Sequence, residues 1–262
     1  MANATIITGG RNEYERIGGG YADRRRPDPR LAGVIAQALG DAATVVNVGA
    51  GTGSYEPSAR GTVAVEPAAV MIAQRAPAAA PCVRAFAEQL PFADRTFDAG
   101  LAVLTIHHWS DWRSGLRELV RVTRRRVVIF TWDPESDGFW LLQDYMPAMI
   151  ERDRRRFPGL GALREELGDI QVQPVPIPHD CTDGFLGAYW RRPAAYLDRA
   201  LRSGISSFAR ADFDAGLARL AADLADGAWA RKHGDLLQRT ELDLGCRLVI
   251  AGQLATITRP GR

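Results

Sequence analysis

The sequence predicts an α/β fold: a doubly wound, mostly parallel, seven-stranded sheet with a helical cap. Two observations support this fold class. Short β-branched runs alternate with helical patterns up to Trp132, and the alternation then gives way to mainly helical patterns. Strands that alternate with helices form parallel sheets through right-handed crossovers, and their ligands bind at the carboxyl ends of the strands.

The first half of the chain carries five of the seven strands. These strands are expected over residues 44–48, 62–65, 82–86, 97–104 and 126–131, where β-branched and apolar residues gather between turn signals. Helical patterns lie over residues 31–39, 68–75 and 112–122. The first of these helices follows Arg26-Pro27-Asp28-Pro29, a typical stop-and-start signal.

The second half supplies the last two strands and most of the remaining helices. Strands are expected over residues 170–177, which prolines interrupt, and over 246–251. A helix is expected over residues 139–156, and several helical pieces over 184–225.

We divide the chain into a short leader and one large domain. Residues 1–30 are expected to form an N-terminal lid segment, with a flexible leader as the alternative. Residues 31–262 form the main domain, in which helices within about 134–160 and 184–242 cap the edge of the sheet.

Charge and cysteine content make several classes of protein poor hypotheses. The net charge is +2 and the arginines are scattered, so no nucleic-acid partner is predicted. Basic runs such as Arg24 to Arg26 are interpreted as solvated faces. Cys82, Cys181 and Cys246 lie far apart without a C-x-x-C pair, so we expect neither a metal site nor a disulfide framework.

No targeting signal is evident at the start of the sequence. The first residues lack the basic start and the apolar stretch of a signal peptide, and no segment reaches the roughly 20 apolar residues that span a bilayer. The prediction is a cytoplasmic protein with no membrane partner, whose oligomeric state the sequence leaves open.

A glycine-rich turn follows the first predicted strand. Residues 45–53 read Val-Val-Asn-Val-Gly-Ala-Gly-Thr-Gly, and alternate glycines let a backbone approach a ligand without Cβ atoms in the way. Glu66 ends the second predicted strand, where a carboxylate can accept hydrogen bonds from both hydroxyls of a ribose. A turn without a ligand and a solvated Glu66 are the alternatives.

The same geometry would serve a nicotinamide dinucleotide. The fingerprint of those cofactors has a third small residue at position 54, where Ser54 stands, whereas Gly53 fits a G-x-G-x-G turn better. This difference is weak evidence. Judged from the glycine turn alone, a nicotinamide-dependent oxidoreductase stays an alternative.

The downstream sequence is more specific. Residues 87–98 read Ala-Glu-Gln-Leu-Pro-Phe-Ala-Asp-Arg-Thr-Phe-Asp and lead into an apolar strand followed by His107 and His108. With the glycine turn and Glu66, this order resembles the type 11 class I methyltransferases, which include the ubiquinone- and menaquinone-biosynthesis enzymes. The resemblance covers about residues 14–131.

The resemblance implies a fold, a cofactor and a reaction. The fold would be Rossmann-like, and the cofactor S-adenosylmethionine (SAM), with S-adenosylhomocysteine (SAH) as product. The methyl group would pass to O, N or C of a small metabolite, with an aromatic one among the candidates. A protein that binds SAM without catalysing transfer is the alternative, because Asn47 replaces the usual acid and Phe86 replaces an aspartate that often contacts adenine.

The resemblance also implies which residues bind the cofactor. The glycine turn would line the methionine and ribose, Glu66 would hold the ribose, Met71 and Ala87 would lie against adenine, and Ala102 would approach the methionine. The candidate cofactor-binding residues are Tyr14, Tyr21, Arg25, Asn47, Gly49, Ala50, Gly51, Glu66, Pro67, Met71, Ala87, Glu88, Ala102 and His107.

Three histidines are candidates for catalysis. Methyl transfer requires mainly alignment and, for some acceptors, removal of a proton. His107 and His108 follow the fourth strand, and an imidazole is a common general base, but we favour a role in shaping the pocket, with His108 nearer the acceptor. His179, which precedes Asp180, is a further candidate base, with a surface turn as the alternative.

Aromatic residues gather at the predicted strand ends and in the cap. They could sandwich a planar acceptor or pack in the core. They are Trp109, Trp132, Trp140, Tyr145, Tyr189 and Trp190.

Overall fold

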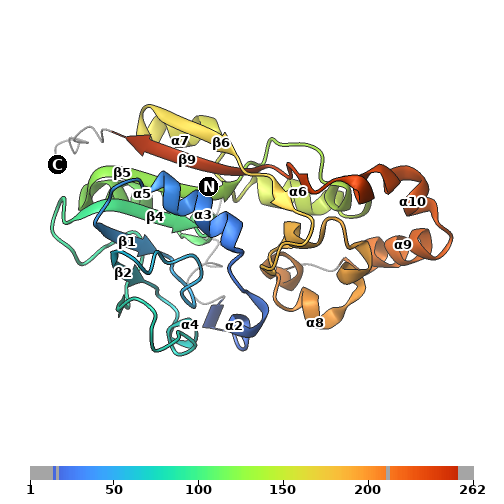
Figure 1. Ribbon diagram of the computed structural model, residues 1–262, viewed down its shortest axis with the longest axis horizontal. Helices are drawn as coiled ribbons and strands as arrows, with labels where there is room; N and C mark the ends of the chain where they lie inside the picture. The colour runs from blue at the N-terminus through green and yellow to red at the C-terminus, as the bar shows by residue number, and fades with distance from the viewer. Residues whose placement is uncertain (1–13, 16–17, 211–212, 253–262) are drawn as a thin grey trace, which may run out of the picture.

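The computed structural model describes residues 14–15, 18–210 and 213–252, and its main feature is a seven-stranded sheet (Figure 1). The strand order is β3-β2-β1-β4-β5-β9-β6. The bounds are β1 Thr44–Val48, β2 Gly61–Val65, β3 Cys82–Val83, β4 Phe97–Val103, β5 Thr123–Trp132, β6 Ile170–Pro174 and β9 Cys246–Gly252. Strands β1 to β5 pair in parallel, and β9 runs antiparallel between β5 and β6. The predicted Rossmann-like, doubly wound, mostly parallel sheet is confirmed.

The strand order reverses at β1, which lies between β2 and β4. Val48 pairs with Val65 of β2, and Asn47 pairs with Leu101 of β4. The carboxyl ends of these three strands therefore meet at one edge of the sheet, where open α/β sheets bind their ligands. Because β9 is antiparallel, this sheet differs from the wholly parallel sheets that are typical of dinucleotide-binding folds.

Helices cover both faces of the sheet. Neighbouring strand residues point to opposite faces, so Val45 belongs to one hydrophobic core and Val46 to the other. Helix α3 (Pro29–Ala38) packs on the first face, and α5 (Trp112–Val122) and α7 (Leu160–Leu167) pack on the second.

Two aspartates fix the starts of the two longest of these helices. The Asp28 side chain accepts a hydrogen bond from the Arg30 N–H, and Pro29 occupies the first helical position of α3. Asp111 accepts from two backbone N–H groups at the start of α5. The helix predicted over residues 112–122 has the observed bounds.

Most of the cap follows β6 and lies to the right of the sheet in Figure 1. Its elements are η2 Leu141–Tyr145, a π-helical turn, with α6 Pro147–Arg154, η3 Leu186–Tyr189, η4 Pro193–Leu197, α8 Arg199–Arg202, η5 Ser206–Arg210, α9 Asp214–Ala225, α10 Ala228–His233 and η6 Gly234–Gln238. Strand β7 (Ile177–Pro178) precedes η3 in the chain and β8 (Glu241–Leu242) follows η6, and the two pair as an antiparallel two-stranded ladder. One hydrophobic core extends from Phe130 of the sheet to Trp190 and Trp229 of the cap.

Prolines shorten two predicted elements. The helix expected over residues 139–156 is divided at Pro147, because proline has no N–H to continue the preceding turn. The strand expected over 170–177 ends at Pro174, and β7 then pairs with β8 in a separate ladder. Both elements were therefore predicted to be longer than they are.

Two further predicted elements are shorter in the structure than expected. The helix expected over residues 68–75 is the single turn α4 (Ala69–Ile72), and the strand expected over 82–86 is the two-residue β3. Helix α2 (Tyr21–Arg24) lies in the predicted lid segment, of which residues 1–13 and 16–17 lie outside the described residues.

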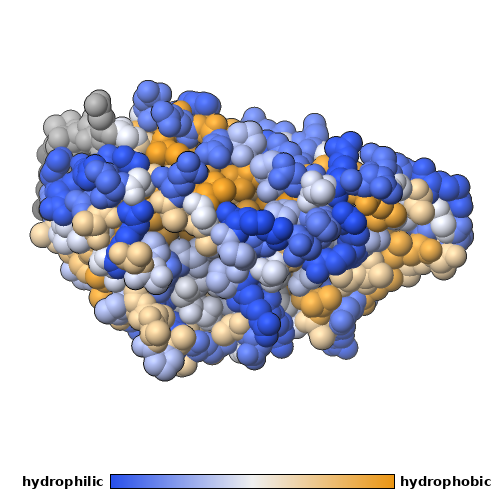
Figure 2. Space-filling view, in the orientation of Figure 1, coloured by the Kyte–Doolittle hydropathy of each residue, from blue (hydrophilic) through white to orange (hydrophobic). Residues whose placement is uncertain are grey.

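Hydrophilic residues dominate the face shown in Figure 2, and hydrophobic residues show between them in patches. Among the described helices, none combines the length and apolar character that crossing a membrane requires.

Candidate active site

The glycine turn after β1 depends on close contact with the end of β4. Gly49 has a φ of +73° and Gly51 a φ of +53°, a left-handed conformation that glycine adopts without strain. A Cβ atom on Gly49 would lie 2.0 Å from Oγ1 of Thr105. Glycine is therefore required at position 49 both by its backbone angle and by the neighbouring strand end.

Glu66 lies beside this turn at the end of β2. Its side chain accepts hydrogen bonds from the Gly51 N–H at 2.8 Å and from the Ala68 N–H at 2.9 Å. The residue is 6% exposed, and burial raises its pKa above the ordinary value although both N–H groups favour the charged form. Each carboxylate oxygen keeps a lone pair for a further donor.

A pocket surrounds the turn and Glu66, and we call it the turn pocket. It is lined by Tyr14, Tyr21, Arg25, Asn47, Gly49, Ala50, Gly51, Thr52, Ser54, Tyr55, Glu66, Pro67, Ala68, Met71, Ala85, Phe86, Ala87, Glu88, Val103, Leu104, Thr105, His108, Trp109 and Ser110. The structure thus brings together every candidate cofactor-binding residue except two. Ala102 is fully buried in β4, and His107 lines a neighbouring pocket instead.

Asn47 offers an unused donor to the turn pocket. Its residue is 1% exposed, and its Nδ2 atom has no hydrogen-bond partner within the described part of the chain. A buried polar atom without a partner is uncommon in proteins and is explained where a ligand completes it. With the acceptor Glu66 and the glycine turn, the pocket has the donors, acceptors and open backbone that a nucleoside bearing an amino acid would require.

Residues of the N-terminal segment line the turn pocket. We call Tyr14 and residues 18–25 the N-terminal strap. The Tyr14 hydroxyl lies 3.0 Å from Nε2 of His108, and the Tyr14 ring contacts the Tyr21 ring edge-on at 5.8 Å. The strap thereby reaches across to the residues that follow β4.

A buried ion pair anchors the strap to the loop after β7. The Arg25 guanidinium donates to both oxygens of Asp183, at 2.6 and 3.0 Å, and also to the Tyr21 hydroxyl. The Tyr55 hydroxyl donates to Asp183 at 2.8 Å. Burial alone would lower the pKa of Arg25, but the Asp183 carboxylate, together with Tyr21 and Tyr14, outweighs it and holds that pKa well above its usual value.

A second pocket, the apolar pocket, adjoins the first. It is lined by Tyr14, Tyr21, Arg25, Leu104, His107, His108, Trp132, Phe139, Leu142, Asp153, Phe157, Phe185, Leu186, Gly187, Ile205, Ser206, Ser207, Leu244 and Cys246. Strap residues, Leu104 and His108 line both pockets. Burial raises the pKa of the Cys246 thiol to about 12, so this group is neutral at physiological pH.

The histidine pair lies where the two pockets meet. His107 and His108 form the 3₁₀ turn η1 (Ile106–His108) after β4, with ring centres 3.9 Å apart. The Phe157 ring stacks on His107 at 3.8 Å and 18°. His108 lines both pockets, whereas His107 lines the apolar one.

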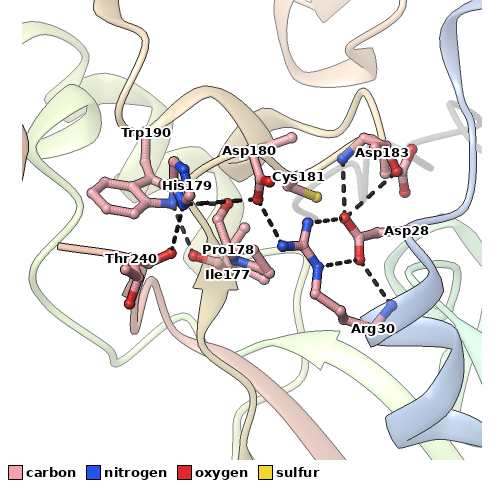
Figure 3. A network of polar contacts seen from close by, with 12 residues as sticks. Asp28, Arg30, Ile177, Pro178, His179, Asp180, Cys181, Asp183, Trp190 and Thr240 are labelled. Carbon is pink, nitrogen blue, oxygen red and sulfur yellow. Dashed lines mark hydrogen bonds and ion pairs between the residues drawn. The ribbon is translucent and has the colours of Figure 1, made fainter.

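His179 lies elsewhere (Figure 3). Its Nδ1 is 3.1 Å from the Thr240 carbonyl oxygen, and Asp180 is ion-paired with Arg30 at 2.7 Å. The described residues that line the two pockets do not include His179. The structure does not bring this candidate base together with the other two.

The aromatic candidates divide between the pockets and the core. Trp109 lines the turn pocket and Trp132 the apolar pocket. Trp140 donates to the Trp190 carbonyl oxygen at 2.8 Å, and both indoles are buried in the cap. Buried Tyr145 and Tyr189 also belong to the core cluster.

Sequence reasoning missed several pocket residues. Thr105, which faces Gly49, follows a strand whose carboxyl end was expected at the site, and this position could have identified it. Leu104 and Tyr55 have positive φ angles of 49° and 62°, which no sequence signal indicated. Backbone strain of this kind gathers at functional sites.

Comparisons with known proteins agree with this geometry. The sequence model of a family described as "Methyltransferase domain" matches residues 46–131. A comparison with curated proteins found no match. A protein of Anabaena variabilis, assigned as a methyltransferase from an antibiotic biosynthesis pathway, is 34% identical, with 87% of this chain and 98% of that chain covered and a TM-score of 0.79.

More distant structures share the fold. The YcgJ protein of Bacillus subtilis is 18% identical, with 87% of this chain and 99% of that chain covered and a TM-score of 0.55. Phosphoethanolamine N-methyltransferase 2 of Haemonchus contortus, solved with SAH, is 13% identical, with coverages of 95% and 61% and a TM-score of 0.57.

Two findings agree on the family: the identity to the Anabaena protein extends over nearly its full length, and the turn pocket lies at the reversal of the strand order. In that pocket a glycine turn and a buried carboxylate meet the Asn47 amide, whose Nδ2 has no partner among the described residues. The family match covers the strands that build this pocket. The chain therefore belongs to the class I SAM-dependent methyltransferases, as an enzyme that uses SAM and releases SAH.

Proposed function

We propose that this methyltransferase acts on a small-molecule acceptor, which binds in the apolar pocket and receives the methyl group on O, N or C. The observation that carries the proposal is the shared boundary of the two pockets at the strap, Leu104 and His108. The apolar pocket is lined mainly by hydrophobic and aromatic side chains with a few polar groups among them, which is typical of sites for small ligands.

The residues of the turn pocket would hold the cofactor. SAM supplies an electrophilic methyl group on a positively charged sulfur. Glu66 would accept hydrogen bonds from the ribose hydroxyls, and Asn47 would donate from Nδ2 to the amino-acid portion. Met71 and Ala87 line the pocket as apolar surfaces for the base. The strap would exclude water and align the two ligands, which is the main requirement of this reaction.

Labelled SAM tests the acceptor class. The protein is incubated with methyl-labelled SAM and with a cell extract divided by size into small molecules and macromolecules. We expect label to enter the low-mass fraction alone. Label on protein or nucleic acid would contradict the proposed acceptor class, while SAH binding measured separately tests the cofactor assignment.

Replacing Glu66 by alanine is expected to weaken SAH binding more than tenfold. The change removes a charged acceptor of hydrogen bonds, which contributes about 1.5–3 kcal/mol. Calorimetric titration measures the affinity, and a circular dichroism spectrum like that of the wild type shows that the fold is retained. An unchanged dissociation constant would reject the ribose assignment.

Cofactor affinity is expected to fall in mild acid. The fall should begin at a higher pH than it would if Glu66 had the ordinary pKa of a glutamate. Burial raises the pKa of Glu66, so the carboxylate takes up a proton early and loses its acceptor capacity. The stability of the free protein changes in the opposite sense. A raised pKa in the folded state favours folding below the unfolded pKa, and this contribution is lost as the pH rises through the folded pKa.

Titrations of SAH across mild acid test this pH dependence. Glu66→Gln is the matched variant, because it keeps the side-chain shape and cannot ionise. We expect its affinity to be lower and flat over the range in which the wild type changes. A parallel decline in both proteins would assign the effect to another group.

Mutation of the histidine pair separates alignment from proton transfer. We propose that His108, which lies at the boundary of the pockets, aligns the acceptor, and that His107 supports it by stacking on Phe157. His108→Ala is expected to lower turnover about tenfold with the acidic limb of the pH profile retained, since positioning errors alone reduce rates. Single-turnover rates across pH measure this once an acceptor is found. A loss of about 100-fold or more with a flattened acidic limb would indicate a general base instead.

A further inference from the structure

Among the described residues that line the apolar pocket, one carries a buried carboxylate, Asp153. Helix α6 carries this residue, which is 4% exposed and lines the pocket among aromatic and aliphatic side chains. Burying a charge in such surroundings is costly unless partners compensate it. The position therefore requires an explanation beyond packing.

The partners of Asp153 account for one of its two oxygens. Arg152 places Nε and Nη2 both 3.0 Å from Oδ1. For Oδ2 there is no hydrogen-bond or ion-pair partner within the described residues. Arg152 itself is held from the other side, where its Nη1 donates to the Ser207 carbonyl oxygen at 3.1 Å.

The charges around the pocket favour a neutral donor as the missing partner. Arg152 already balances the charge of Asp153, and the Arg25 guanidinium is balanced by Asp183. A cationic ligand would add an unbalanced charge to this apolar space, whereas a hydroxyl would satisfy the free oxygen without one.

The contacts of helix α6 show where Asp153 lies relative to the boundary between the two pockets. The Phe157 N–H donates to the Asp153 carbonyl oxygen at 2.9 Å, so the two residues are one helical turn apart. Phe157 stacks on His107 beside the boundary with the turn pocket. Asp153 lines the apolar pocket together with Phe157 and His107, and it is not among the described residues that line the turn pocket.

We propose that Asp153 determines acceptor specificity, and that the acceptor is an apolar, ring-bearing molecule with a hydroxyl group remote from the methylated atom. The ring packs against the stacked wall of His107 and Phe157, and the hydroxyl donates to Oδ2 of Asp153. This inference rests on the proposed function of the apolar pocket and deepens it by naming the chemistry of the acceptor.

Three matched probes test the inference on the full chain saturated with SAH. They are 4-propylphenol, 4-propylanisole, which lacks the donor, and 4-propylbenzylamine, which carries a cation. Ligand-observed NMR titrations give their dissociation constants. We expect the wild type to bind the phenol about tenfold more tightly than the anisole, and more tightly than the amine. Equal affinities, a preference for the amine or no saturable binding would overturn the proposal.

Variants at the ion pair assign the preference to Asp153. Asp153→Leu is expected to abolish it, and the near-isosteric Asp153→Asn to reduce it. Arg152→Gln is expected to shift the preference toward the amine, because the carboxylate then lacks its cation. Glu151→Gln removes an equal charge from the exposed side of α6 and should change nothing. A preference for the phenol that persists in both Asp153 variants would overturn the proposal.

The same measurements keep the two levels of inference apart. SAH affinity is determined first for every variant, and a value like that of the wild type shows that each variant is folded. Failure to bind SAH in the wild type would count against the cofactor site, whereas unchanged probe selectivity with intact SAH binding would count against Asp153 alone.

Discussion

Replacing Asp183 by alanine is expected to lower the free energy of unfolding by about 3–5 kcal/mol. Its side chain is fully buried, and the Arg25 side chain that it pairs with is 12% exposed. The variant would leave a buried guanidinium without its counter-ion, and the Tyr55 hydroxyl and the Gly184 N–H without their acceptor. Denaturant unfolding monitored by circular dichroism measures the change.

The neighbouring Asp180 provides the matched control (Figure 3). It is ion-paired with Arg30 at 2.7 Å, but its side chain is 58% exposed and that of Arg30 is 47% exposed. Solvent screens such a pair, so Asp180→Ala should change stability little. Similar losses in the two variants would contradict the argument that burial makes the Arg25 pair important.

The Asp183 variant is also expected to weaken SAH binding. Arg25 and Tyr21 line both pockets, and Asp183 is the residue that ties Arg25 to the loop after β7. A protein that lost stability but kept its full affinity for SAH would show that the strap is anchored by other contacts.

The sequence predicted the sheet and the cofactor side of the site because both depend on local patterns. A β-branched run before glycines identifies β1, and a carboxylate after the next run identifies Glu66. The glycine turn after β1 and Glu66 after β2 lie at the same edge of the sheet because the two strands are parallel. The alternation of strands and helices predicts this parallel pairing.

The acceptor side could not be predicted in the same way. Asp153 and Cys246 reach one pocket from segments nearly a hundred residues apart, and no spacing rule links them. His179 is a candidate base in the sequence because an acid follows it. In the structure its Nδ1 lies 3.7 Å from Oδ1 of Asp180, which also pairs with Arg30 at 2.7 Å. His179 is not among the described residues that line either pocket, and no spacing in the sequence indicates this.

Proline effects explain the remaining differences in the fold. Apolar periodicity alone extends a helix through Pro147 and a strand past Pro174, because the missing N–H group does not change the hydrophobic pattern. The resulting break places α6, and with it Asp153, against the apolar pocket.

Replacing Gly49 by alanine is expected to weaken SAH binding by about 30-fold or more. A φ of +73° costs a residue with a Cβ atom about 1–2 kcal/mol, and displacing a packed neighbour costs about 1–3 kcal/mol more. The neighbour is Thr105, whose Oγ1 and Cβ atoms would lie 2.0 and 2.8 Å from the new methyl carbon. Because each 1.4 kcal/mol changes affinity about tenfold, a turn displaced at a total cost of about 2–5 kcal/mol loses affinity about 30-fold or more.

Gly51→Ala is the control that separates backbone strain from the clash. Its φ of +53° is also positive, but its added Cβ would contact the flexible end of Met71 at 3.3 Å. We expect this variant to lose clearly less affinity than Gly49→Ala. The double variant Gly49→Ala with Thr105→Ala should recover part of the loss, because it removes the hydroxyl that lies closest. Calorimetric titration with SAH compares the four proteins. Equal losses at positions 49 and 51, with no recovery in the double variant, would show that the contact between the turn and the end of β4 does not shape the cofactor pocket.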